Sequence, residues 1–342
     1  DPEELEVDII ELDTMDADIV AEKINAYACS KFVFDYRKLE LVNNRALPEM
    51  VDVVIVGAGV TGLYAAKRLL ENEISFCVVD KRDITGGIWS LYANSTSQVN
   101  TSEGAYRIID KKTRSNRDHS TTREILEDIS DLSRTSADNL FLNAEVDRID
   151  KFDNLYQINI IRNQEKHIVK SKGVILAIND RVGTPRKVDW QNQDKYRGSI
   201  ISGTSSVADD FDWKNKKVVI VGMGAFAVEN ARTALAGGAR HVTVVCRRHG
   251  TVCPKIIDYL NFTTPYDENF AHDKKSNMRN MLLWKKLYDQ SGATQPECWM
   301  GKIKHDGHTI SVSDIWFIGH FLKKLATLTG TITGMYEDGV IV

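Results

Sequence analysis

The stretch VDVVIVGAGVTG, residues 51–62, decides the fold of the chain's first half. Its apolar, β-branched start predicts a buried strand, and residues 63–70 after the glycines have the spacing of a helix. Gly57 permits a sharp turn, Gly59 lets an anionic ligand approach the backbone, and Gly62 lets the helix pack closely on the strand. The stretch therefore predicts a strand, a tight turn and a helix whose N-terminus attracts anionic oxygens.

A second predicted strand, residues 75–80, ends in Asp80. A carboxylate at that place can accept a hydrogen bond from a ribose hydroxyl. The order of strand, GxGxxG turn, helix, strand and acid predicts a unit that binds a dinucleotide, with Ala58 and Lys81 also in the site. The alternative is an ordinary turn of a parallel sheet whose glycines are incidental.

Paired glycines follow this unit. Gly86 and Gly87 lie in the loop that leads to Trp89, and they can bring backbone close to a bound ligand while Trp89 packs beside it. Taken alone, the loop is a turn followed by a core aromatic residue. After a dinucleotide-binding unit, it predicts a further part of the same site.

The following segments alternate helical and strand patterns. Residues 121–132 predict an amphipathic helix with a Ser/Thr-rich start. Three segments alternate like antiparallel strands and predict a small β insertion, namely residues 144–150, 156–161 and 167–169. The apolar run 173–178 predicts a buried parallel strand that returns to the first sheet.

A second unit of the same kind begins at residue 216, where residues 216–227 have the sequence KKVVIVGMGAFA. Gly222, Gly224 and Ala225 would form its turn, before a helix that ends near residue 235 at a pair of glycines. The chain therefore contains two predicted dinucleotide-binding units.

The strand after the second turn ends differently from its counterpart. Residues 241–246 end in Cys246, at the place that Asp80 has in the first unit, and Arg247 and Arg248 follow directly. An acid there would repel a 2′-phosphate, whereas two guanidinium groups bind it and stack on adenine. The pattern favours NADP(H) over NAD(H), and two surface arginines at the end of a strand are the alternative.

Length and composition limit the classes of protein. With 342 residues, 42% of them apolar, the chain is long enough for about two domains. A formal net charge of −4 gives no basic field, so we expect no nucleic-acid partner. No apolar run is long enough to span a bilayer. Scattered cysteines without a CxxC pair predict a reducing compartment, no obligatory disulfides and no metal site: Cys29, Cys77, Cys246, Cys253 and Cys298.

The remaining segments carry fewer motifs. Residues 1–50 predict a helical extension with a helix near residues 19–34, and an acidic partner-binding arm is the alternative. Residues 251–330 predict helices that elaborate the second unit, with His305 and His308 facing solvent rather than binding a metal. The last residues predict strands around a turn. We expect a cytoplasmic protein, although the start at Asp rather than Met leaves a removed organellar segment open.

These motifs resemble those of the flavin-dependent monooxygenases of the flavin-containing monooxygenase-like group, over residues 51–248 and the final strands. The resemblance implies an α/β fold with two Rossmann-like dinucleotide-binding domains. An FAD-binding domain would occupy residues 51–183, and an NADPH-binding domain with a helical insertion would occupy residues 184–342. The resemblance also implies that the NADPH domain is inserted in the FAD domain, which the chain would re-enter beyond residue 342.

The same resemblance assigns roles to the motif residues. FAD would be held by Gly57, Gly59, Gly62 and Asp80, with Gly86, Gly87 and Trp89 near it, and NADPH by Gly222, Gly224 and Arg247. Asn100, in Val-Asn-Thr-Ser, resembles the family's active-site asparagine, and a loop asparagine that bonds its own backbone is the alternative. Ser202 stands where the family has a histidine, and Asn179 stands where it has a glycine.

The activity that the resemblance implies is that of an NADPH-dependent monooxygenase. FAD and O2 would form a C4a-(hydro)peroxyflavin that oxygenates a small organic substrate at a soft nitrogen or sulfur centre. A Baeyer-Villiger or halogenating relative is one alternative, and a non-catalytic FAD-binding scaffold or sensor is another. A pyridine nucleotide:disulfide reductase would need two cysteines close in sequence beside the flavin, and the chain has none. The sequence leaves a homo-oligomer open.

Overall fold

The computed structural model describes residues 45–102, 106, 108, 116–178, 188–201, 205–263, 274–296, 299 and 310–342. These residues lie in one compact unit, Leu41–Val342. Several predictions fall outside the described residues: the helix near residues 19–34, the turn with His305 and His308, and the two departures at Asn179 and Ser202.

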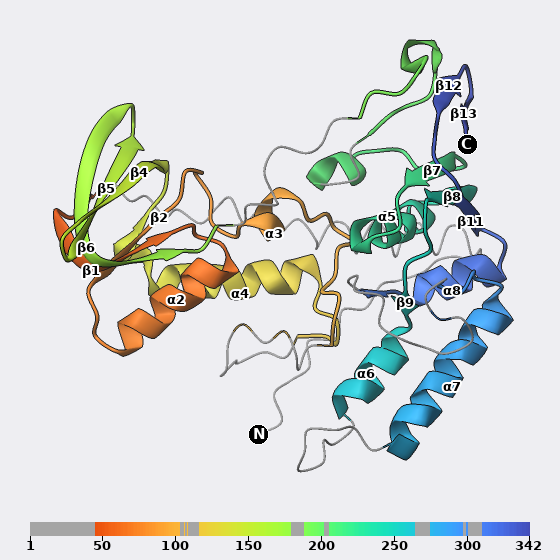
Figure 1. Cartoon of the computed structure of the whole chain (residues 1–342), viewed down its shortest axis with the longest axis horizontal. Helices are drawn as coiled ribbons and strands as arrows, with labels where there is room; N and C mark the ends of the chain where they lie inside the picture. Colours follow the sequence, from red (N-terminus) through yellow and green to blue (C-terminus); the bar gives the residue numbers. More distant parts are fainter. Residues whose placement is uncertain are drawn as a thin grey trace, which may run out of the picture. The chain divides into compact units, whose positions relative to one another are not determined.

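A six-stranded sheet is the framework of the chain's first half. In the order β3-β2-β1-β6-β5-β4, its strands are Leu140–Phe141, Phe76–Val79, Met50–Val56, Glu165–Leu176, Leu155–Arg162 and Ala144–Phe152. β1, β2 and β3 are parallel, while β4, β5 and β6 form an antiparallel meander (Figure 1). The predicted β insertion is confirmed, and it extends the main sheet.

β6 differs from the prediction. The segments 167–169 and 173–178, expected as two strands, form one continuous strand that pairs antiparallel with β5 and parallel with β1. No turn residues separate the segments, and Gly173 lies inside the ladder opposite Val53. The expected burial of the last residues is wrong, since 60% of Leu176 and 63% of Ile178 are exposed. No described residue fully covers the side chains at this end of the strand.

Two helices pack together beside this sheet. α2, Val60–Glu71, follows the first glycine turn, and α4, Thr122–Thr135, buries its apolar face. α4 begins with a capping box, because the Thr121 side chain accepts from the Glu124 backbone and the Glu124 carboxylate accepts from Thr121. The predicted helix at residues 121–132 is therefore confirmed.

The second glycine turn belongs to a separate parallel sheet, with the strand order β11-β8-β7. β7 is Lys217–Val221, β8 is His241–Cys246 and β11 is Leu325–Thr329, while the helices α5 and α8 are Ala225–Ala236 and Asp314–Phe321. α5 ends at Gly237, and Gly238 follows with a φ of +85° that favours glycine. β12, Gly334–Tyr336, and β13, Gly339–Ile341, form the predicted terminal hairpin.

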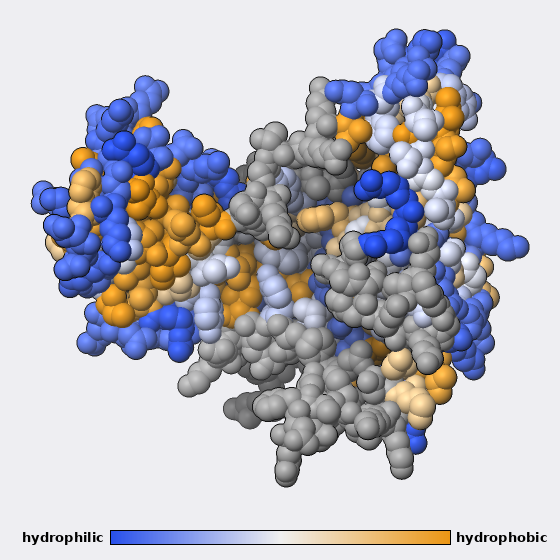
Figure 2. Space-filling model, in the orientation of Figure 1, coloured by the Kyte–Doolittle hydropathy of each residue, from blue (hydrophilic) through white to orange (hydrophobic). Residues whose placement is uncertain are grey.

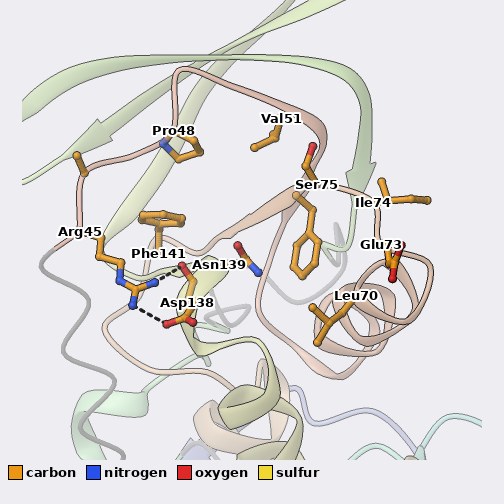
Figure 3. Close-up of a pocket in the computed structure, with 12 residues that line it drawn as sticks. Arg45, Pro48, Val51, Leu70, Glu73, Ile74, Ser75, Asp138, Asn139 and Phe141 are labelled. Carbon is orange, nitrogen blue, oxygen red and sulfur yellow. Dashed lines mark hydrogen bonds and ion pairs between the residues drawn. The ribbon is translucent and has the colours of Figure 1, made fainter.

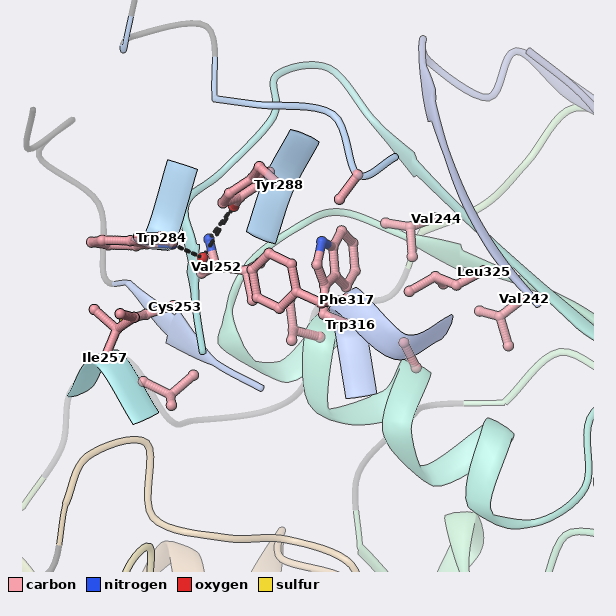
Figure 4. Packing of buried hydrophobic residues seen from close by; sticks show 14 of the residues in the cluster. Val242, Val244, Val252, Cys253, Ile257, Trp284, Tyr288, Trp316, Phe317 and Leu325 are labelled. Atoms are coloured by element: carbon pink, nitrogen blue, oxygen red, sulfur yellow. Dashed lines mark hydrogen bonds between the residues drawn. The ribbon is translucent and has the colours of Figure 1, made fainter. Parts of the chain in front are cut away.

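Aromatic side chains fill the core beside the second sheet. The short strands β9, Val252–Cys253, and β10, Ser311–Val312, pair in parallel next to helices α6, Lys255–Thr263, and α7, Lys274–Ser291. Trp284 Nε1 donates to the carbonyl of Val252 at 2.9 Å, and the Tyr288 hydroxyl bonds both the N–H and the carbonyl of Val252 (Figure 4). The predicted helical segment therefore covers the second sheet with an aromatic layer.

Tyr288→Phe should destabilise this core. Tyr288 is fully buried, and its hydroxyl accepts from the Val252 N–H at 2.9 Å. Removing the acceptor from a buried N–H costs about 1–3 kcal/mol of unfolding free energy. Urea denaturation measures the loss, with Tyr336→Phe, at a half-exposed tyrosine, as the control. Equal midpoints for the two variants would show that this hydrogen bond adds nothing to stability.

Candidate functional site

The first glycine turn is closed by backbone contacts. The N–H of Gly57 donates to the carbonyl of Val79 at 2.8 Å, and its φ of +107° favours glycine. A Cβ at Gly57 would lie 2.5 Å from the carbonyl oxygen of Ala177, and a Cβ at Gly62 would overlap the carbonyl oxygen of Gly57. Both positions therefore exclude a side chain by packing within the protein.

Gly59 lies in a different situation. Its backbone is extended, with φ at −79° and ψ at −177°, and no side-chain hydrogen bond caps the N-terminus of α2 that it begins. Among the described residues, a Cβ at Gly59 would meet only Gly87 within 4 Å, at the ordinary contact distance of 3.5 Å from its Cα. No described residue would therefore clash with a Cβ at Gly59, in contrast to Gly57 and Gly62.

The paired glycines pack on this turn. The Gly86 N–H donates to the carbonyl of Ala58 at 2.9 Å, and a Cβ at Gly87 would lie 3.0 Å from the Cα of Gly59. The short helix α3, Ile88–Leu91, follows, and its Trp89 donates through Nε1 to the hydroxyl of Tyr106 at 3.1 Å. The structure therefore brings these predicted site residues to the first turn.

Asp80 ties the end of β2 to the same turn. Its Oδ2 accepts from the Ala58 N–H at 2.7 Å, and its Oδ1 accepts from the Arg82 N–H at 3.0 Å. Arg82 also donates through Nη1 to the carbonyl of Gly87 at 3.1 Å. The side chain of Lys81 is exposed. The acid, the turn and the paired glycines form one connected group.

The second turn repeats this design with more open space. The Gly222 N–H donates to the carbonyl of Val245 at 2.8 Å, as Gly57 does to Val79, and its φ is +101°. A Cβ at Gly222 or at Gly224 would meet no atom of the described residues within 4 Å. No side-chain hydrogen bond caps α5, which begins at Ala225. The described residues therefore leave the space in front of this helix N-terminus open.

Cys246 occupies the place that Asp80 has in the first unit. Its Sγ lies 3.9 Å from the side-chain sulfur of Met223, the residue between the two glycines, whereas Asp80 accepts from the backbone N–H of Ala58, the residue between Gly57 and Gly59. Arg247 and Arg248 follow, and both are exposed. The two units therefore share one backbone design and differ in the charge at the end of the strand.

A polar segment, residues 94–102, joins the two units, and we call it the strap. Its backbone is held by the start of α4, because the Thr122 hydroxyl donates to the carbonyls of Asn94 and Ser97. The other side of the strap bonds α5. The Ser97 hydroxyl donates to Glu229 of this helix. Arg232, also in α5, donates to Gln98 at 2.9 Å and to the Thr96 carbonyl at 2.5 Å. No sequence motif indicated this contact.

The strap also carries Asn100. Its Nδ2 donates to the carbonyl of Ile310 at 2.5 Å, and its Oδ1 accepts from the Val312 N–H at 2.6 Å. The amide therefore bonds the backbone around β10, more than 200 residues away in the chain, rather than its own loop. Its role in oxygen transfer stays a prediction.

The strap ends at a second polar contact. Ser102 donates through its N–H and its hydroxyl to Asp258 Oδ2, at 2.7 and 2.8 Å. The same carboxylate oxygen lies 3.3 Å from Nε2 of the buried His119, whose Nδ1 is 2.9 Å from Asp118. Of these residues, only Asp258 lies in a segment that the sequence predicted as helical, and no motif indicated that the others would meet it.

A cavity of about 440 Å³ lies at the opposite end of the first sheet. Val51, Phe76 and Phe141 line it, and Arg45 pairs with Asp138 at its rim at 2.6 Å (Figure 3). Figure 2 shows hydrophobic side chains gathered between the strands of this sheet and α2. Because dinucleotides bind at the carboxyl ends of parallel strands, this cavity is separate from the two turns.

Thiols and metal ligands give no further site in the described residues. Cys77, Cys246 and Cys253 are buried and form no disulfide. Burial raises the pKa of Cys77 to about 12, and it raises the pKa of Cys253 as well. Within this part of the chain, no group of three His, Cys, Asp or Glu side chains could hold a metal ion, and no helix could cross a membrane.

Two glycine turns of one design, each between a parallel strand and a helix, define the class of α/β proteins with two dinucleotide-binding domains. The solved structure of oxidized steroid monooxygenase bound to NADP has this fold, with a TM-score of 0.63 at 14% identity over 85% of this chain and 68% of that one. The family model described as pyridine nucleotide-disulphide oxidoreductase matches residues 54–266. The chain belongs to that family.

Two curated relatives are monooxygenases by name. FAD-binding monooxygenase VdtE of Byssochlamys spectabilis is 24% identical over 229 residues, which cover 64% of this chain and 39% of the relative. A Baeyer-Villiger monooxygenase of Pseudooceanicola batsensis is 27% identical over 266 residues, 73% of this chain and 45% of the relative. The chain thus spans less than half the length of these relatives, which confirm the resemblance predicted from the motifs.

Proposed function

We propose that this protein is an FAD- and NADPH-dependent monooxygenase that acts on a small organic substrate. The observation that carries the proposal is the pair of matched glycine turns with opposite charge at the strand ends, Asp80 in one and Arg247 with Arg248 in the other. The names of the relatives, FAD-binding monooxygenase and Baeyer-Villiger monooxygenase, support it.

The first turn fits FAD. Gly59 leaves room at an uncapped helix N-terminus, where backbone N–H groups favour a pyrophosphate. Asp80 is fixed by the Ala58 N–H and keeps carboxylate lone pairs for a ribose hydroxyl. Gly86, Gly87 and Trp89 complete this proposed site.

The second turn fits NADPH. The open space at Gly222 and Gly224 would receive the pyrophosphate in front of α5. Cys246 is neutral when protonated, and the exposed Arg247 and Arg248 would bind the 2′-phosphate. We propose a domain boundary in the segment between β6 and β7, because the two sheets share no strand. An insertion of one domain in the other stays part of this proposal.

The cofactors, when bound, supply the redox chemistry and the activation of O2. The chain's own residues bind and orient them, which is why no nucleophile or paired carboxylates are required. Asn100 would contribute an amide donor that does not titrate. Its contacts with Ile310 and Val312 hold that amide in one orientation.

A Baeyer-Villiger oxygenation of a carbonyl is the second candidate, favoured by the name of one relative. The first candidate reaction is oxygenation of the substrate at a soft nitrogen or sulfur atom. Thiol-disulfide exchange at Cys77 or Cys253 is disfavoured, because burial raises the pKa of both thiols, and a thiol without thiolate character is a poor nucleophile.

One experiment tests the proposal. The purified protein should show the visible absorbance of bound FAD and should oxidise NADPH faster when a substrate is present. The added substrate distinguishes the reactions. Amines and sulfides test oxygenation at a soft centre, ketones test Baeyer-Villiger oxygenation, and halides test halogenation. Bound FAD without NADPH oxidation would point instead to a non-catalytic scaffold or sensor, and a colourless wild-type protein that takes up no FAD would overturn the proposal.

Replacing both arginines, Arg247→Ala with Arg248→Ala, should remove the preference for NADPH. Losing charge-assisted hydrogen bonds to a 2′-phosphate costs about 1.5–3 kcal/mol, which is about a tenfold to hundredfold loss in efficiency with NADPH. Efficiency with NADH should hardly change. Arg240→Ala, at an exposed arginine just before β8, is the matched control. An unchanged ratio of NADPH to NADH efficiency would contradict the assignment.

A further inference from the structure

α5 presents three polar side chains to the strap from one face. Glu229, Arg232 and Thr233 are spaced i, i+3 and i+4, so they lie together on the helix. Thr233 bonds the Thr96 hydroxyl at 2.7 Å, Glu229 accepts from Ser97, and Arg232 lies near Glu229 at 4.0 Å. Three consecutive strap residues, 96–98, therefore bond this face.

Arg232 is the centre of this contact. Its Nη1 donates to Gln98 Oε1 at 2.9 Å and its Nη2 to the carbonyl of Thr96 at 2.5 Å, so the planar guanidinium holds two groups of the strap at once. Gln98 Oε1 also accepts from Lys255 Nζ at 2.6 Å. Arg232 is largely buried, and burial lowers its pKa while the Glu229 charge raises it.

The contact connects the two glycine turns through rigid elements. α2 begins at the first turn and packs on α4, and the start of α4 holds the strap's carbonyls. The strap then bonds α5, which begins at the second turn. Arg232 lies about 12 Å along α5 from Gly224, at 1.5 Å per residue. A contact that holds α5 at this distance from its N-terminus fixes the direction of the helix axis. It would thereby also fix the orientation of a nucleotide bound at that N-terminus.

We propose that Arg232 is a positioning residue that fixes the NADPH-binding unit relative to the FAD-binding unit. This inference rests on the proposed function. Arg232 touches neither glycine turn in the structure, so its replacement should leave the affinities for FAD and NADPH unchanged. The rate of flavin reduction at saturating NADPH should fall, because that rate depends on how the two bound cofactors meet.

The test compares Arg232→Met with Arg240→Met. Methionine keeps the apolar body of the side chain, and exposed Arg240 lies in the same unit. In the protein without added cofactors, hydrogen exchange of the strap peptide should rise in Arg232→Met only. In the FAD-loaded protein, flavin reduction at saturating NADPH should slow about tenfold or more, with the NADPH dissociation constant unchanged.

The outcomes distinguish a failure of this inference from a failure of the proposed function. Unchanged strap exchange in Arg232→Met overturns the inference, as does faster exchange with a wild-type reduction rate or a loss confined to NADPH affinity. If the wild-type protein takes up no FAD, the proposed function fails, while strap exchange still decides whether Arg232 fixes the units. If Arg232→Met does not fold, Arg232→Lys replaces it in the test. Lysine keeps the positive charge but lacks the planar guanidinium that bonds two groups at once, so it should also slow flavin reduction and leave the NADPH dissociation constant unchanged.

Discussion

Gly59→Leu should give a folded protein without flavin. The backbone of Gly59 is extended, which any residue adopts, and its Cβ would meet Gly87 only at an ordinary distance. The rest of a leucine side chain would then fill the space in front of α2, where the pyrophosphate of FAD would lie. Losing two charge-assisted hydrogen bonds costs at least about 3 kcal/mol, so FAD affinity should fall about a hundredfold or more.

The chain offers a matched control for this variant. Gly224 has the same place in the second turn, with an extended backbone, and a Cβ added there would meet no atom of the part of the chain that the structure describes within 4 Å. Gly224→Leu should therefore keep FAD and lose NADPH binding. Visible absorbance and circular dichroism separate flavin loss from unfolding. A folded Gly59→Leu protein with full flavin absorbance would show that the first turn does not bind FAD.

Neighbouring glycines would not give this result. Gly57 has a positive φ, and a Cβ added at Gly62 would overlap the carbonyl oxygen of Gly57. A side chain at either position would therefore strain the protein itself. The motif already predicted a sharp turn at Gly57, close packing at Gly62 and the approach of a ligand at Gly59. Among the described residues, the structure leaves no room for a side chain at Gly57 or Gly62 and leaves room at Gly59.

Local patterns predicted the elements well where one segment carries the whole signal. The two glycine turns, the helix with a Ser/Thr-rich start at α4 and the terminal hairpin are such cases, because turn and cap geometry depends on neighbouring residues. β6 was divided in two, since its two halves face different neighbours and their hydrophobic patterns differ.

Contacts between distant segments could not be predicted in this way. The bonds of the strap to Glu229, Arg232 and Asp258 join positions more than 130 residues apart, and nothing in either segment alone indicates the other. The polar residues of α5 are ordinary helix-surface residues until the strap is placed against them. The backbone partners of Asn100 were missed for the same reason.

Asn100→Ala should uncouple NADPH use from oxygenation. The variant should keep FAD and NADPH-driven flavin reduction, and it should release more hydrogen peroxide and less oxygenated product. A positioned amide donor matters only after O2 has reacted, and removing such a donor costs about a hundredfold or more in the step it serves. Stopped-flow reduction and peroxide yield measure the two effects separately.

The contacts of Asn100 with β10 make a second variant informative. Asn100→Asp keeps an acceptor for the Val312 N–H but loses the donor to the carbonyl of Ile310 and any donor toward a ligand. If the donor serves oxygenation, both variants uncouple the reaction. If Asn100 only joins the strap to β10, both should lower the unfolding free energy, by about 1–3 kcal/mol for Ala, and oxygenate with wild-type coupling. The active site would then have to be sought in residues 251–328.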